Sequence, residues 1–147
     1  MGSWNNRWYT LKYLIIFKSM ELYKQYEYLI KANESIEKEQ SKIRVALSNY
    51  ENKKTENNIV KKELGLLDDE DIVYKLIGPI LVQQETSEAK IQVDSRIEMI
   101  NKEIHKLEKN YQENAKNMES NRAKIADIQG KLIQISKQAQ QMKKEGK

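Results

Sequence analysis

The sequence has no cysteine, one histidine, one proline and five glycines among 147 residues. The missing cysteines exclude disulfides and thiolate metal ligands, and a lone histidine, His105, argues against a zinc site. So few helix breakers, together with 39% hydrophobic and 33% charged residues, are typical of long helices and coiled coils within a single domain. No apolar run approaches the roughly 20 residues that a membrane span requires.

Motifs that carry chemistry are also missing. The sequence has no phosphate-binding loop, no Gly-rich nucleotide motif and no constellation of nucleophile, base and acid, so we expect neither an enzyme nor a bound cofactor. Lysines and glutamates are interspersed and the net charge is only +4, which argues against nucleic-acid binding. The acidic run at residues 68–71 lacks the alternating spacing of a calcium loop, and we interpret it as a solvated linker.

Two segments carry heptad repeats that predict helices over residues 20–64 and 85–144. In the first segment, mostly apolar residues recur every seven positions from Leu22 to Leu64. In the second, two interleaved series include apolar residues from Val93 to Met142. Repeats of this kind predict a coiled-coil seam, here between two antiparallel helices. The glycine after Leu64 is expected to end the first helix in a left-handed conformation.

Polar residues within the seam predict the register of the two helices. If the numbers of facing residues sum to about 154, Asn33 meets Asn121 and Gln40 meets Asn114, so that each buried amide finds another amide. A register one heptad away would place Asn114 against Leu47. We therefore expect the first register, because a buried amide needs a hydrogen-bonding partner.

Residues 72–84 predict a β-hairpin between the two helices. Two short runs of mostly apolar residues flank Gly78-Pro79, and such a dipeptide is a turn signal. The first strand is largely apolar on both faces and therefore expects cover on both sides, which this chain has nothing left to provide. We expect the hairpin to assemble with other chains through Ile72, Val73, Tyr74, Leu76, Ile77, Ile80, Leu81 and Val82.

Residues 1–19 differ from the rest, because they contain both tryptophans and the only phenylalanine. One interpretation is a non-essential extension or an upstream start of translation. The other is an aromatic cap over the end of the second helix. In the cap interpretation the heptad of the first helix continues back through Ile15 to Trp8, and Ile15 would lie against Ala139 in a weak, frayed pairing.

Residues 55–104 resemble the β-type subunits of the prefoldin family. The resemblance rests on TENNIVKKEL at 55–64, Leu66-Leu67-Asp68, VYKLIGPILVQQ at 73–84 and Glu88-Ala89. Over residues 20–54 and beyond 104 only the heptads agree. Residues 20–147 would then be the prefoldin domain, and residues 1–19 fall outside the family pattern.

The resemblance implies a fold and a function. The fold would be mainly α: a long antiparallel two-helix coiled coil whose central hairpin joins an intersubunit β-barrel. The complex would be a cytosolic hexamer of two α-type and four β-type subunits that works without ATP. It would hold unfolded proteins, such as actin and tubulin, and deliver them to the cytosolic chaperonin. The alternative function is a purely structural coiled-coil spacer, which would not need a hairpin apolar on both faces.

A holding function would place client contacts at the tips of the two helices. The candidates are Leu22, Tyr23, Tyr26, Ile30, Ile128, Leu132, Ile133, Ile135 and Met142. Ile30 and Ile133 lie off the heptad seam, so we expect these two to be the more exposed. For most of the others, seam packing is the alternative interpretation.

Overall fold

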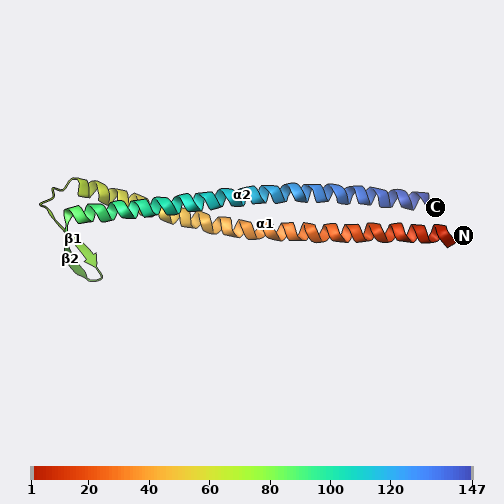
Figure 1. The fold of residues 1–147 in the computed structure, drawn as a ribbon, viewed down its shortest axis with the longest axis horizontal. Helices are drawn as coiled ribbons and strands as arrows, with labels where there is room; N and C mark the ends of the chain where they lie inside the picture. The colour runs from red at the N-terminus through yellow and green to blue at the C-terminus, as the bar shows by residue number, and fades with distance from the viewer. Residues whose placement is uncertain (1, 147) are drawn as a thin grey trace. The chain divides into compact units, whose positions relative to one another are not determined.

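The structure is a computed structural model that describes the backbone of residues 2–146 and the side chains of residues 6–146. Its elements are helix α1 (Gly2–Gly65), strand β1 (Ile72–Ile77), strand β2 (Ile80–Glu85) and helix α2 (Thr86–Glu145), labelled in Figure 1. Two long helices joined by an antiparallel hairpin confirm the predicted fold class. The chain divides into two compact units, which we describe separately. The terminal unit is Met1–Glu39 with Glu113–Lys147, and the hairpin unit is Gln40–Gln112.

Helix α1 begins at Gly2, so the expected start at Met20 is wrong. No proline interrupts residues 2–19, and the hydroxyls of Thr10 and Ser19 donate to main-chain carbonyls about one turn earlier, within the helix. The composition changes at Met20, but bulky aromatic and aliphatic side chains cost a helix only tenths of a kcal/mol, about 0.7 at most, per residue. A change of side chains therefore does not end the helix.

The terminal unit is an antiparallel pair formed by the first part of α1 and the last part of α2, which lie side by side in Figure 1. Leu29 and Ile128 are its buried seam residues. In the same unit, Asn121 Nδ2 donates a hydrogen bond of 2.9 Å to Asn33 Oδ1, and both amides are half-buried. This bond confirms one of the two amide pairs from which the register was predicted.

The hairpin unit contains most of the buried apolar side chains of the described chain. These are Ile43, Leu64, Ala89, Val93, Ile100 and Ile104. Gln40 is also buried, and its Nε2 donates to the main-chain carbonyl of Tyr111 at 3.1 Å. The sequence predicted that Gln40 would face the amide of Asn114. The long side chain of Gln40 instead reaches the main chain of the facing helix and bonds to a backbone carbonyl. Its Oε1 has no hydrogen-bonding partner among the described residues.

The end of α1 differs from the expected left-handed glycine cap. Among residues 2–146 the only glycine with a positive φ is Gly78, so Gly65 remains in the ordinary right-handed region. The last carbonyls of the helix are satisfied differently: Leu66 N donates to Glu63 O and Leu67 N to Leu64 O, both at 3.2 Å. These three-residue bonds tighten the last turn in the manner of a 3₁₀ helix and make a left-handed residue unnecessary.

Candidate interaction surfaces

The hairpin is closed by a two-residue turn, Gly78-Pro79. The strands pair antiparallel from Ile77 opposite Ile80, next to the turn, to Ile72 opposite Glu85 at the base. Gly78 has a φ of 59°, a value that a residue with a side chain rarely adopts. Glycine at the first central position is the signature of a type II′ turn, whose twist matches that of the flanking strands. The predicted turn dipeptide therefore sets the register of the hairpin.

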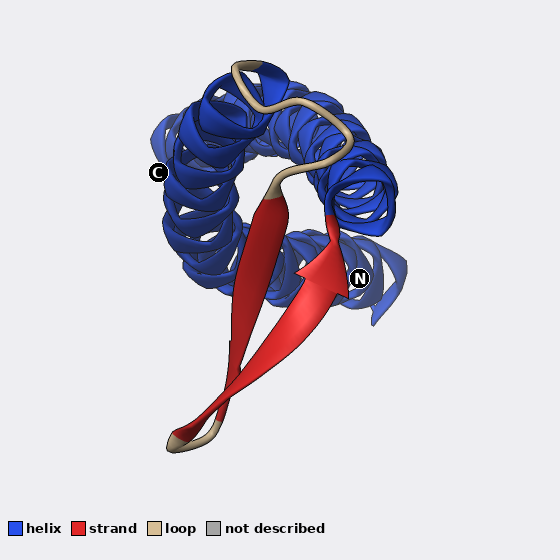
Figure 2. Cartoon of the chain, turned by 90° about the vertical axis from the view of Figure 1, so that its left-hand side faces the viewer, coloured by secondary structure: helices blue, strands red, loops and turns tan. Residues whose placement is uncertain are grey.

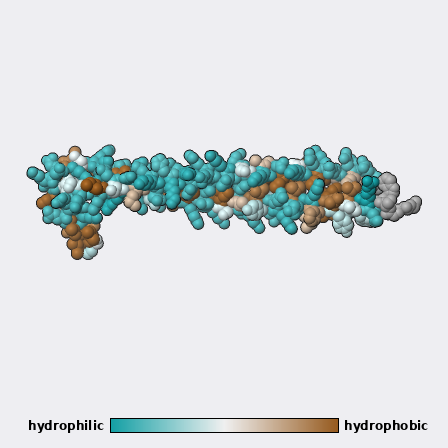
Figure 3. All heavy atoms as spheres, in the orientation of Figure 1, coloured by the Kyte–Doolittle hydropathy of each residue, from teal (hydrophilic) through white to brown (hydrophobic). Residues whose placement is uncertain are grey.

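The hairpin exposes apolar side chains on both of its faces. Successive residues of a strand point to opposite faces, so Tyr74 and Leu76 share one face and Lys75 and Ile77 share the other. Seven of the eight residues predicted for assembly are exposed, namely Ile72 57%, Tyr74 59%, Leu76 67%, Ile77 55%, Ile80 63%, Leu81 65% and Val82 43%. Figure 3 shows them as a hydrophobic patch on the hairpin, which Figure 2 shows standing away from the adjoining helix ends. A contiguous patch of this kind marks an interaction site.

Val73, the eighth predicted assembly residue, anchors the base of the hairpin instead. It is half-buried against a small core formed by Leu64, Ala89 and Val93. Its role is therefore to fix the hairpin to its own helices. The remaining seven residues form an exposed apolar patch, which we call the assembly patch after the role predicted for it.

Thr86 holds the two ends of the hairpin together. It is the first residue of α2 and the only fully buried residue among the described ones. Its hydroxyl donates to the carbonyl of Asp71, the residue just before β1. A threonine at the start of a helix commonly caps it, with its side-chain oxygen accepting a bond from the main chain. The structure uses that hydroxyl as a donor to the preceding loop, so the start and the end of the hairpin are pinned to each other.

Lysines connect the hairpin and its preceding loop to α2. Lys75 Nζ donates to Gln92 Oε1 at 3.3 Å, and Lys90 Nζ donates to the carbonyl of Leu67 at 3.2 Å.

Within the acidic run the Asp71 carboxylate accepts a hydrogen bond from the backbone of Asp68 at 2.7 Å, which closes a tight turn. Across residues 6–146 no group of three or more histidine, aspartate or glutamate side chains is placed to hold a metal ion.

The nine predicted client residues all fall in the terminal unit, in three states of exposure. Ile128 is buried, Tyr23 and Ile133 are each 58% exposed, and the other six are half-buried. Ile133 is thus exposed as expected, but Ile30 is not. Ile30 directly follows the buried Leu29 and flanks the seam, where the facing helix covers part of its side chain. Seam packing therefore accounts for Ile128 and for part of the half-buried group.

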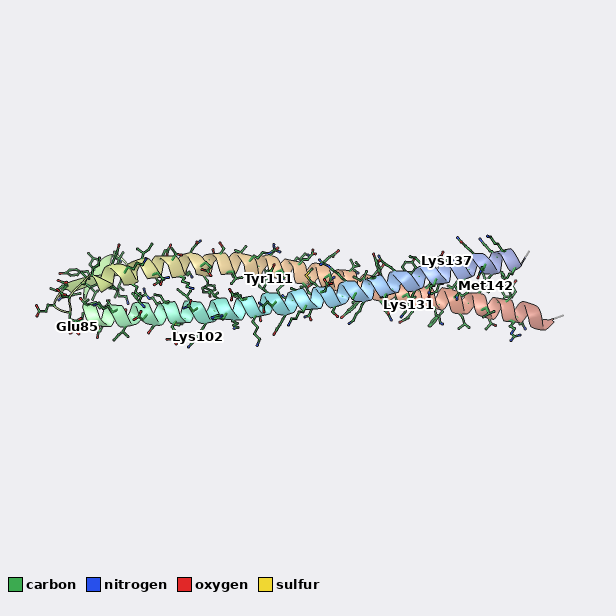
Figure 4. The ribbon with its side chains drawn as sticks, turned by 90° about the horizontal axis from the view of Figure 1, so that it is seen from above. Glu85, Lys102, Tyr111, Lys131, Lys137 and Met142 are labelled. Atoms are coloured by element: carbon green, nitrogen blue, oxygen red, sulfur yellow. The ribbon has the colours of Figure 1, made fainter. Side chains whose placement is uncertain are left out.

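Two grooves run between the helices of the terminal unit. The tip groove, about 830 Å³, lies between residues 11–22 of α1 and 131–145 of α2, and its apolar lining includes Phe17 and Met142. The lysine groove, about 430 Å³, lies between residues 24–29 and 124–131. Figure 4 labels Met142 where α2 faces α1. Both grooves offer apolar surface to a ligand that can enter from solvent.

The start of α1 covers the end of α2. Ile15 and Ala139 line one small cavity of about 190 Å³ together with Trp8, so the residues predicted to pair lie on the same part of the interface between the two helices. The Trp8 ring also lies against Gly146, and Lys12 Nζ sits 5.8 Å from the centre of that ring.

The sequence reasoning missed several exposed apolar residues on α1. These are Tyr9, Leu11, Tyr13, Leu14, Ile16, Phe17 and Met20, which are 46–72% exposed. It also missed the lysines of the lysine groove. The heptad running back from Leu22 through Ile15 was the available signal, because it predicts that residues 8–19 are helical. Helical periodicity in turn places the intervening apolar residues on the faces turned away from α2.

Comparison with known proteins identifies the family. The fold places the chain among helical hairpins whose two long helices are joined by an exposed apolar β-hairpin. Residues 27–132 match the sequence pattern of the family described as "Prefoldin subunit". The chain therefore belongs to the prefoldin family, and the resemblance seen in the sequence is confirmed.

Two named relatives support the assignment. "Prefoldin subunit 6" of Mus musculus is 44% identical over 75 residues, which cover 51% of this chain and 59% of that protein. "Probable prefoldin subunit 6" of Drosophila melanogaster is 39% identical over 87 residues, covering 59% of this chain and 70% of that protein. The chain thus spans just under three fifths of the mouse relative that it matches.

The crystal structure of the prefoldin beta subunit from Thermococcus strain KS-1 has the same fold. It aligns with a TM-score of 0.65 at 19% identity and covers 70% of this chain and 90% of that one. No helix within the described residues combines the length and the apolarity needed to cross a bilayer.

Proposed function

We propose that this chain is a β-type subunit of a prefoldin complex, a chaperone that holds unfolded proteins without ATP. The observation that carries the proposal is the exposed hairpin: seven large apolar side chains, each 43–67% exposed, on a two-stranded sheet. A two-stranded hairpin is marginal in water, and its free edges invite pairing with other strands. The hairpins of neighbouring prefoldin subunits would supply both the missing strands and the cover.

The client surface in this proposal is the terminal unit. Its two grooves present aliphatic, aromatic and methionine side chains, and methionine adapts to ligands of different shape. Each contact is weak, but several subunits of one complex could hold different parts of the same unfolded chain. Binding of this kind gains strength from multivalency rather than from any single contact.

The proposal extends to partners that the family resemblance implies. They are other prefoldin subunits of the α and β types, the cytosolic chaperonin, and unfolded clients such as actin and tubulin. The complex would act in the cytosol. A purely structural spacer explains the heptads equally well, but it gives no reason for the exposed two-faced hairpin or for the apolar grooves.

The test is a measurement of aggregation. The chain is purified together with the subunits it assembles with, and chemically denatured actin is diluted into that complex in the absence of nucleotide. Light scattering from aggregated actin should decrease as more complex is added. Unchanged aggregation at a molar excess of the complex would contradict the holding function. If the complex in that preparation is normally assembled, the same result would favour the structural spacer.

A further inference from the structure

Basic charge is concentrated in one part of the terminal unit. Residues 2–20 of α1 contain three basic side chains and no acidic one, and residues 128–144 of α2 contain four lysines and no acidic residue. The whole chain has a net charge of +4, so these seven basic residues leave −3 for the remainder. The tip groove lies almost entirely within these two stretches and the lysine groove lies next to them, and lysines line both grooves beside apolar residues.

The lysine groove shows this combination most clearly. Leu29 and Ile128 line it and are buried at 9% and 5% exposure, whereas Tyr28 is 73% exposed. Lys24 and Lys124 line the same groove from the two helices, and both are exposed. Neither lysine forms an ion pair with any side chain that the structure describes.

One acidic residue also lines the lysine groove, but it already has a partner. Asp127 Oδ2 lies 3.2 Å from Lys131 Nζ, one turn away on α2. This leaves Lys24 and Lys124 available to an incoming anion. The tip groove is closer to neutral, because Glu21 and Glu145 line it as well. The lysine groove is therefore the place where charge can select a ligand.

We propose that the lysine groove selects unfolded segments in which acidic side chains flank apolar ones. This inference rests on the proposed holding function and names the class of client segment that this chain prefers. Apolar side chains of the client pack on the exposed Tyr28 and on the small surface that Leu29 and Ile128 present to the groove, and its carboxylates reach Lys24 and Lys124. The apolar lining favours a polypeptide over a nucleic acid, because a sugar-phosphate backbone has no apolar side chains to pack against it.

The experiment compares three fluorescent peptides with the assembled complex that contains the full chain. The peptides share their length and their leucine and phenylalanine positions, and their polar positions are all glutamate, all glutamine or all lysine. Two exposed ion pairs, each weak, predict up to about tenfold tighter binding of the glutamate peptide than of the glutamine peptide. The lysine peptide should bind most weakly. High salt should reduce the differences in affinity between the three peptides, because the lysine charges are solvent-exposed and salt screens them.

Matched variants locate the effect. Lys24→Gln combined with Lys124→Gln should remove most of the preference for the glutamate peptide over the glutamine peptide. Lys24→Arg with Lys124→Arg keeps the charge and should keep the preference. Lys109→Gln is the control, because Lys109 is an exposed α2 lysine of the hairpin unit that lines neither groove.

The outcomes separate the two proposals. Equal affinities for the glutamate and glutamine peptides would overturn charge selection and leave the holding function standing. A complex that binds none of the three peptides would contradict the holding function itself. An RNA oligonucleotide of the same charge that binds more tightly than the glutamate peptide would overturn the assignment of the groove to acidic polypeptides.

Discussion

Leu76→Asp should prevent this chain from entering its complex while leaving its own fold intact. Leu76 is 67% exposed on the hairpin and lies opposite Leu81, which is 65% exposed. In the isolated chain the aspartate would therefore stay in water at little cost. In an assembly that covers both faces of the hairpin, the same carboxylate would be buried without a partner.

The magnitude follows from these exposures. Full burial of a leucine side chain is worth about 1.5–3 kcal/mol, so covering the exposed two thirds of Leu76 contributes about 1–2 kcal/mol per subunit. Burying an unpaired charge adds several kcal/mol more, unless the group takes up a proton. A combined loss of about 4 kcal/mol would weaken association by about a thousandfold.

The assay is co-purification of the tagged chain with its partner subunits, followed by size-exclusion chromatography and circular dichroism. Leu76→Asp should elute without partners and keep the helical signal of the parent chain. Val45→Asp is the matched control, because Val45 is 63% exposed but lies on α1. Normal co-elution of Leu76→Asp would refute the assembly role of the hairpin, as would equal loss of partners with Val45→Asp.

Three further predictions concern the helices and the extension. Replacing Asn33 and Asn121 together by leucine should raise the free energy of unfolding by about 1–3 kcal/mol more than the sum of the two single replacements, because each single replacement leaves one amide unpaired. If the changes in free energy measured by urea unfolding are additive, the 2.9 Å bond does not couple the two residues. Thr86→Val should cost about 1–3 kcal/mol by leaving the Asp71 carbonyl unpaired, and Thr86→Ser should restore most of it in the same measurement. A chain lacking residues 1–19 should bind unfolded client more tightly than the full chain in a fluorescence titration, because the end of α2 is then uncovered. Equal affinity of the two chains would contradict the cap interpretation.

The hairpin and the seam were readable from the sequence because local chemistry determines both. Gly78 supplies a backbone conformation that other residues avoid, and the apolar runs on either side have no alternative partner nearby. The heptads place the seam because their period matches that of the helix. The Asn33–Asn121 pair followed from the same logic, since only one register gives both amides a partner.

The misses share a different cause, which is that several satisfactory solutions existed. Gln40 could bond an amide or a backbone carbonyl, and only the three-dimensional position of Tyr111 decides between them. Gly65 could have ended α1 in a left-handed conformation, but two short-range bonds satisfied the last carbonyls first. The exposure of Ile30 depends on how far α2 wraps around the seam, which periodicity alone does not specify.

The two units differ in how firmly they are packed, and the difference matches their proposed roles. Six apolar side chains are buried in the hairpin unit, where the assembly patch needs a rigid support. Among the described residues of the terminal unit only Leu29 and Ile128 are buried to the same degree, and a hydrogen-bonded amide pair replaces a further apolar contact. Regions with few buried apolar contacts open locally at low free-energy cost. A surface that must accept unfolded chains of many shapes benefits from that property, whereas a platform that must join several subunits does not. The polar seam near the client surface is therefore consistent with a holding function, because maximal stability there would remove the adaptability that the grooves require.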